Sequence, residues 1–140
     1  MQPVLIDSNI LIDLFTDNPE WGGWSRDQLT LLSSSTLLFI NPIVYSEISI
    51  GFERIEELEE CLALLPLRMA ELPEAALFLA GKAFLKYRRS KRTKNTTLPD
   101  FFIGAHAAVN NWGIITRDAK RMSYYYPGVR IISPESEFRL

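Results

Sequence analysis

The sequence predicts an α/β fold with a central, mostly parallel sheet flanked by helices. Short runs of branched apolar residues without polar alternation, such as PVLID at 3–7, are typical of strands buried on both faces. These runs alternate along the chain with longer segments of helical apolar spacing, which is the order found in parallel α/β sheets. With 140 residues, of which 47% are apolar, the chain is expected to form a single domain over residues 1–140.

The first half of the chain is expected to supply two strands and four helices. The pair Asn18-Pro19 separates the first two helices. Asn41 and Pro42 mark the start of the third, because Asn is a preferred N-cap and Pro fits the first helical position. The strands are predicted at 3–7 and 36–40, and the helices at 10–18, at 24–35, from 42 onward and at 55–65.

The second half is expected to add three strands and three helices. The longest helical pattern has Pro73 near its start, and the loop TKNTT follows it. Pro99 opens the next helix, which Gly113 ends. The strands are predicted at 66–72, 113–116 and 129–133, the helices at 73–92, 100–112 and 118–125, and the loop at 93–97.

The net charge of −2 hides a division between two parts of the chain. Residues 1–60 carry 11 acidic and 2 basic side chains, a balance of −9, and residues 61–140 carry 6 acidic and 13 basic side chains, a balance of +7. A polyanion is therefore expected to bind one face of the protein rather than the whole of it.

Composition also bears on the compartment. The single cysteine, Cys61, excludes an intramolecular disulfide, which fits a reducing cytoplasm. Charged residues break the apolar stretches well short of the length of a membrane span. We expect a cytoplasmic protein without membrane association.

Four carboxylates fall where the chain leaves the predicted sheet. Asp7 ends the first strand, and Asp118 follows the strand at 113–116 by two residues. Glu47 lies in the helix after the second strand, and Asp100 lies in the first turn of the helix that Pro99 opens. Because ligands of open α/β sheets bind beyond the carboxyl ends of the strands, we expect these four side chains to meet at one edge of the sheet.

Each of these acids also has a structural interpretation. Asp7, Asp100 or Asp118 alone could cap a helix or complement its dipole. Glu47 is harder to explain in this way, because its neighbours are apolar and a lone buried carboxylate is unfavourable.

As a set, four converging carboxylates repel one another, and a divalent cation relieves that repulsion. Mg²⁺ is held by one or two carboxylates together with water and substrate phosphate, and the chain has no Cys/His cluster for zinc. The set therefore predicts a Mg²⁺ or Mn²⁺ site for phosphoryl chemistry.

Five segments, in this order, resemble the PIN-domain family, in particular the VapC-type ribonuclease toxins of bacterial toxin–antitoxin pairs. They are IDSNILID (6–13), PIVYSEI (42–48), LPDFFIGAHA (98–107), IITRD (114–118) and VRIISP (129–134). The resemblance covers nearly the whole chain and implies a PIN-like three-layer α/β/α fold. It also implies a homodimer and a cognate antitoxin protein as partner.

The resemblance further implies an endoribonuclease that hydrolyses RNA phosphodiester bonds with Mg²⁺ or Mn²⁺. It assigns Asn9 and Thr116 a supporting role beside the acids. Ser8 is expected to cap a helix, and Asp13 to face outward or to bond the following backbone. The residues that it implies as both catalytic and metal-binding are Asp7, Glu47, Asp100 and Asp118.

Basic side chains near the acids are expected to bind the RNA backbone. The run KYRRSKRTKN at 86–95 leads directly to Asp100, and contacts of this kind give affinity without sequence readout. A solvated helix end, where cations are favoured, is the alternative, and Arg117 could equally pair with a carboxylate. The predicted RNA-binding residues are Lys86, Arg88, Arg89, Lys91, Arg92, Lys94, Arg117 and Arg121.

Two other functions stay open at this point. The first is a Mg²⁺-dependent phosphatase or receiver-like domain with Asp7 as phosphoryl acceptor, although Asn9 stands where such phosphatases usually have a second Asp. The second is a non-catalytic RNA-binding or protein-binding module, in which the basic run would matter more than the acids. His106, the only histidine, is expected to be a packed core residue and not a general base.

Overall fold

The computed structural model describes residues 2–90 and 98–134, which form one five-stranded sheet and seven helices. Every strand pairing is parallel, and the strand order is β3-β2-β1-β4-β5. The strands are β1 (Val4–Ile6), β2 (Leu38–Ile40), β3 (Leu67–Met69), β4 (Gly113–Ile115) and β5 (Ile131–Ile132).

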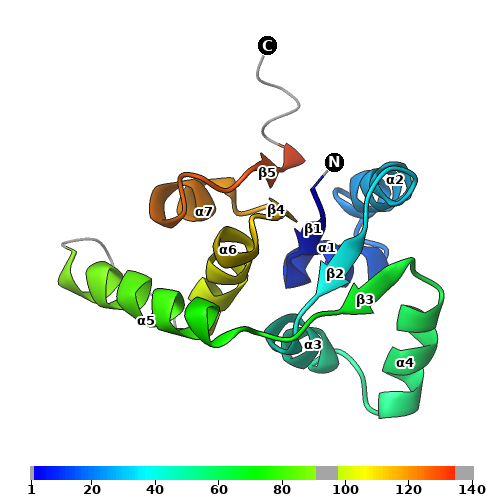
Figure 1. Cartoon of the computed structure of the whole chain (residues 1–140). Coiled ribbons are helices and arrows are strands. Elements are labelled where there is room, and N and C mark those ends of the chain that lie inside the picture. Colours follow the sequence, from blue (N-terminus) through cyan, green and yellow to red (C-terminus); the bar gives the residue numbers. More distant parts are fainter. Residues whose placement is uncertain (1, 91–97, 135–140) are drawn as a thin grey trace.

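The helices lie on both sides of this sheet. Helices α6 and α7 lie on one side, and α2 and α4 lie on the other (Figure 1). This arrangement confirms the three-layer α/β/α prediction. The helices are α1 (Ser8–Phe15), α2 (Gly22–Ser33), α3 (Pro42–Ser49), α4 (Ile55–Ala63), α5 (Glu74–Arg89), α6 (Pro99–Asn110) and α7 (Ala119–Tyr125).

The element boundaries differ from the predictions where pairing or capping decides them. Helix α1 begins at Ser8 and not at residue 10, because the Asp7 carboxylate accepts a hydrogen bond from the Ser8 amide and caps the helix. Strand β3 is shorter than the predicted 66–72, because β2 offers only three residues to pair with it. The predicted loop at 93–97 lies outside the described residues.

The central strand β1 is completely buried, and its three side chains are 0% exposed. It pairs with β2 on one side and with β4 on the other, so that apolar side chains of the helices cover both of its faces. This explains why its sequence is apolar without alternation. None of the described helices is long and apolar enough to cross a membrane.

Helices α6 and α7 approach each other at a glycine. A Cβ atom at Gly104 would overlap the ring of Tyr126 and would lie 3.1 Å from the Met122 sulfur. Tyr126 cannot move aside easily, because it is buried and its hydroxyl donates a 2.8 Å hydrogen bond to the Phe101 carbonyl. Gly104 therefore sets how closely α7 packs, and α7 follows directly after Asp118.

This packing makes a prediction. Gly104→Ala should lower the free energy of unfolding by about 2 kcal/mol, because overpacking a filled contact outweighs the gain in helix propensity. In Gly81→Ala the added methyl meets nothing within 4 Å, so this variant in α5 should be stabilised by about 0.5–1 kcal/mol. Urea unfolding of both variants tests this, and equal stability of the two would contradict it.

Candidate active site

The site lies where the strand order reverses. From β1 the chain passes outward to β2 and β3, and then returns to the other side of β1 as β4. In open α/β sheets, ligands bind at such a switch point, beyond the carboxyl ends of the strands. Asp7 follows β1 and Thr116 follows β4, so these two residues meet although 109 positions separate them.

Asp7 is fixed by hydrogen bonds to both of its carboxylate oxygens. One oxygen, Oδ1, accepts from the Ser8 amide at 2.7 Å. The other, Oδ2, accepts from the Thr116 hydroxyl at 2.6 Å and from the Asn9 amide nitrogen at 3.2 Å. The residue is only 5% exposed, so these donors hold a nearly buried carboxylate in one orientation.

Asn9 and Thr116 tie the two strand ends together. The Asn9 side-chain oxygen accepts from the Arg117 amide at 3.2 Å, and the Thr116 hydroxyl accepts from the Asp118 amide at 2.9 Å. The segment that carries Asp118 is therefore attached to the residues around Asp7. The side chains of Asn9 and Thr116 thus position Asp7 and Asp118.

Glu47 reaches the site from α3, and Ser8 links it to Asp7. The Ser8 hydroxyl lies 3.0 Å from Glu47 Oε1 and 3.4 Å from Asp7 Oδ1. The expectation that the Ser8 side chain caps a helix was wrong, because the Asp7 carboxylate caps α1 instead. This leaves the serine hydroxyl to contact the second acid.

Asp118 and Asp100 complete the acidic edge. Asp118 precedes α7 without capping it through its side chain, and its carboxylate forms an ion pair with Arg121 one turn later. Asp100 lies in the first turn of α6, close enough for its charge to raise the pKa of Glu47. Asp118 acts on Asp7 in the same way.

Burial and mutual repulsion make the ionised site unfavourable. Burial is the main cause that raises the pKa of Asp7, and hydrogen bonds from Thr116 and Ser8 oppose it. Burial is also the main cause that raises the pKa of Glu47, and the charge of Asp7 adds to it. The guanidinium of Arg121 opposes both upward shifts.

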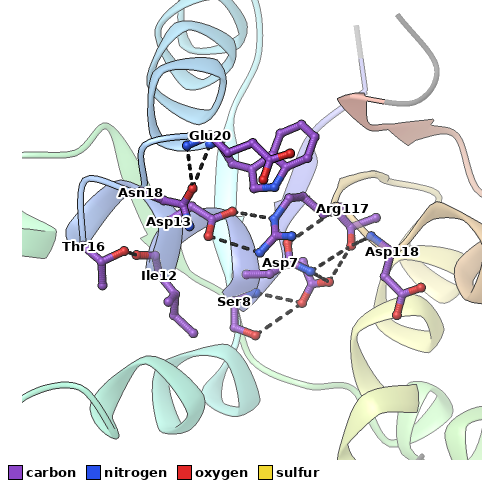
Figure 2. A network of polar contacts seen from close by, with 12 residues as sticks. Asp7, Ser8, Ile12, Asp13, Thr16, Asn18, Glu20, Arg117 and Asp118 are labelled. Atoms are coloured by element: carbon purple, nitrogen blue, oxygen red, sulfur yellow. Dashed lines mark hydrogen bonds and ion pairs between the residues drawn. The ribbon is translucent and has the colours of Figure 1, made fainter. Parts of the chain in front are cut away.

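Asp13 is buried, and the expectation that it faces outward or bonds the following backbone was wrong. It does not face outward: its side chain is 4% exposed and forms a two-point ion pair with Arg117, at 2.5 Å to Nε and 3.1 Å to Nη2. Figure 2 shows these two side chains pointing toward each other, from α1 and from the segment after β4. Arg117 also lies over the ring of Trp21, 5.7 Å from its centroid.

This pair was missed although the sequence carried a signal for it. Asp13 stands between Ile12 and Leu14 in a helix that packs on the sheet, so the argument against a lone buried carboxylate that applies to Glu47 applies here too. Arg117 forms the ion pair with a carboxylate that was the alternative to RNA binding, and its contact with RNA stays a prediction.

The basic run is described only in part. Lys86, Arg88 and Arg89 end α5, whereas Lys91, Arg92 and Lys94 lie outside the described residues. Lys86 and Arg89 line an open hollow of 380 Å³ together with Tyr124, and Lys86 lies over the Tyr124 ring. Binding of RNA by these basic residues stays a prediction.

His106 is a core residue, as expected. It is completely buried, its Nδ1 lies 3.2 Å from the Asn41 amide nitrogen, and its ring packs against Trp112. Burial lowers its pKa, so the neutral ring accepts from Asn41. Asn41 in turn caps α3, the helix that carries Glu47.

Comparison with known proteins identifies the family. The family model described as PIN domain matches residues 4–125, which include all four acids. The chain belongs to the PIN domain family. PIN domains are nucleases, so this membership makes the chain a hydrolase of nucleic acids. A search of curated proteins returned no match.

Solved structures share this PIN fold. A chain of VapBC2 from Rickettsia felis, bound to a promoter DNA fragment, is 18% identical with a TM-score of 0.72, and the match covers 94% of this chain and 98% of that one. A chain of VapBC-1 from nontypeable Haemophilus influenzae is 19% identical with a TM-score of 0.70, and the match covers 94% of this chain and 97% of that one. A chain of a toxin–antitoxin complex from Klebsiella pneumoniae is 24% identical with a TM-score of 0.66, and the match again covers 94% of this chain and 97% of that one.

The carboxylates of this PIN domain are the type of ligand that a hard divalent cation prefers, but they do not form a complete set of metal ligands. Among residues 2–90 and 98–134, no three Asp, Glu, His or Cys side chains lie close enough together to form a metal site. The donors are nevertheless all carboxylate oxygens, and their repulsion is what a cation would relieve. Mg²⁺ keeps several waters and needs only one or two direct carboxylates.

A stability experiment tests the burial of Asp7. Because the folded state raises its pKa, the folded protein binds more protons than the unfolded chain just above the ordinary carboxyl range, and stability falls as pH rises through that window. Asp7→Asn, measured in EDTA, should therefore be more stable than wild type at pH 7 by about 1 kcal/mol. The difference should shrink toward pH 4. Exposed Asp27→Asn is the control, and an unstable Asp7→Asn at pH 7 would contradict the argument.

The Asp13–Arg117 pair is tested by a double-mutant cycle. Asp13→Asn should destabilise the fold by about 2 kcal/mol, because it leaves a partly buried guanidinium without its carboxylate. Arg117→Gln should have a smaller effect, since the Arg117 side chain is 34% exposed. The coupling energy from urea unfolding should exceed about 1 kcal/mol. If the effects of the two single substitutions are additive, the two side chains do not stabilise each other.

Proposed function

We propose that this PIN domain is a metal-dependent endoribonuclease and the toxin of a toxin–antitoxin pair. The observation that carries the proposal is Asp7: a nearly buried carboxylate at the switch point of the sheet, with a raised pKa, with Asp118 and Glu47 close to it and with Asp100 close to Glu47. Groups whose burial makes ionisation unfavourable, placed beside other groups of the same charge, are typical of catalytic centres.

A divalent cation, Mg²⁺ or Mn²⁺, would bind at this acidic edge with one or two of the four carboxylates as direct ligands and the others bonded through its water. Such an ion activates water for attack on phosphorus and stabilises the charge that develops there. Asp7 is held in one orientation, because three neighbouring groups donate hydrogen bonds to it. Glu47 lies within α3, Asp100 lies in the first turn of α6, and Asp118 directly precedes α7. These three acids would orient the water molecules around the cation.

The basic residues would hold RNA above the acids. Lys86, Arg88 and Arg89 lie at the end of α5, and the basic run continues from there toward Asp100. Contacts with phosphates fix the position of the strand without reading its sequence. Arg117 is better assigned to holding the segment after β4, because Asp13 occupies its guanidinium.

The partner proteins are part of the same proposal. The Rickettsia and Haemophilus structures above are VapBC assemblies, and the Klebsiella structure is a toxin–antitoxin complex. Together with the family they support a cognate antitoxin for this chain. We further propose a homodimer that acts in the cytoplasm.

Cleavage of RNA by the purified protein tests the nuclease. Wild type with Mg²⁺ or Mn²⁺ should cut RNA, and EDTA should abolish the cutting. Asp7→Asn and Glu47→Gln should lower the rate at least 100-fold while the far-UV circular dichroism stays native and the Tm is not lowered, because each removes a charge on which the site depends.

The control variant is Glu60→Gln, an exposed acid of α4, which should cleave as wild type does. RNA binding that survives EDTA and the acid variants, without any cleavage, would favour a non-catalytic RNA-binding module. Stable phosphorylation of Asp7 without RNA cleavage would favour a phosphatase or receiver-like domain. Either result would refute the nuclease.

A further inference from the structure

Within residues 2–90 and 98–134, one arginine brings a positive charge to the acidic edge. Arg121, on the first turns of α7, forms an ion pair with Asp118 three residues before it. Its side chain is 31% exposed, and that of Asp118 is 34% exposed, so the pair lies in the wall of the site and not on the open surface. The same guanidinium acts electrostatically on Asp7 and on Glu47.

Arg121 therefore differs from the other arginine of this segment. Arg117 forms two hydrogen bonds with Asp13, which is not one of the four acids. Arg121 forms an ion pair with one of those four acids, Asp118, and its charge lowers the pKa of two others, Asp7 and Glu47. Its charge is permanent, because a guanidinium does not lose its proton in proteins.

Asp118 can exchange one partner for another without a change of backbone. Its amide is held by the Thr116 hydroxyl at 2.9 Å, while its carboxylate makes no capping bond to α7. Next to Arg121, the buried Met122 packs against α6 and keeps the helix in place. Movement of the two side chains alone would thus open or close the ion pair.

We propose that Arg121 is a built-in counter-cation of the acidic site, which pairs with Asp118 beside Asp7 and Glu47 when no metal is present and which a divalent cation must displace in order to bind. The inference rests on the proposed function of this edge as a metal site. It explains how four acids stay together before loading, and it makes occupancy depend on the concentration of the cation.

The consequence is competition between two positive charges for one set of carboxylates. Removing the guanidinium should tighten the binding of a divalent cation and weaken the metal-free protein. A residue that served only to hold RNA phosphates would change neither quantity in the absence of RNA. This contrast distinguishes the two roles for Arg121.

The experiment measures Mn²⁺ binding to RNA-free protein by titration calorimetry and by the electron paramagnetic resonance signal of free Mn²⁺. Arg121→Gln should bind Mn²⁺ about 10-fold more tightly than wild type. In EDTA its Tm should be lower by about 3 °C, and saturating Mn²⁺ should raise that Tm more than it raises the Tm of wild type. Arg121→Lys keeps the charge and should stay within about threefold of the wild-type Kd.

Lys120→Gln is the matched control, because it removes one exposed positive charge from the neighbouring position of the same helix. It should change the Kd less than twofold. Equal Kd values for Arg121→Gln and Lys120→Gln, or weaker Mn²⁺ binding by Arg121→Gln, would overturn the counter-cation. So would the absence of Mn²⁺ binding in every variant, which would refute the metal site as well.

The two proposals can fail separately. If Arg121→Gln tightens Mn²⁺ binding but the wild-type protein cleaves no RNA, the counter-cation stands and the nuclease does not. If wild type cleaves RNA with Mn²⁺ and the Kd of Arg121→Gln is unchanged, the nuclease stands and Arg121 is left with a role in holding RNA.

Discussion

The structure depends on one unfavourable group, the nearly buried carboxylate of Asp7 at the end of a completely buried strand. A charge in this position is retained only with compensation, and the surrounding residues supply it in two forms. Donors from Ser8, Asn9 and Thr116 satisfy its oxygens, and Arg121 supplies positive charge nearby. Each of these residues is positioned by the sheet or by a helix that starts at its edge.

The parallel topology explains how such distant residues come together. Because β1 lies between β2 and β4, its carboxyl end is flanked by α3, which follows β2, and by the segment between β4 and α7. Glu47 comes from the former and Asp118 from the latter. The hydrogen bonds of Asn9 then join the ends of β1 and β4 directly, so the segments that carry Asp7 and Asp118 are fixed to each other.

Two arginines only four residues apart illustrate how local sequence and tertiary position combine. Arg117 and Arg121 both follow β4, and both pair with an aspartate. Arg117 meets a carboxylate from α1 that is outside the acidic set, and it fastens the chain after β4. Arg121 pairs with Asp118, one of the four acids, and its charge lowers the pKa of Asp7 and Glu47.

The sequence by itself determined the fold class and the order of its elements. The apolar runs at 3–6 and 113–115 favour strands buried on both faces, and the Asn41-Pro42 cap fixes where α3 begins. It also named the acids, because carboxylates after buried strands of a parallel sheet have one edge to occupy. Only the tertiary structure decided which groups pair with them. The partners of Ser8, Asp13 and Arg121 lie on other elements or depend on how a side chain is directed, and neither can be derived from spacing along the chain.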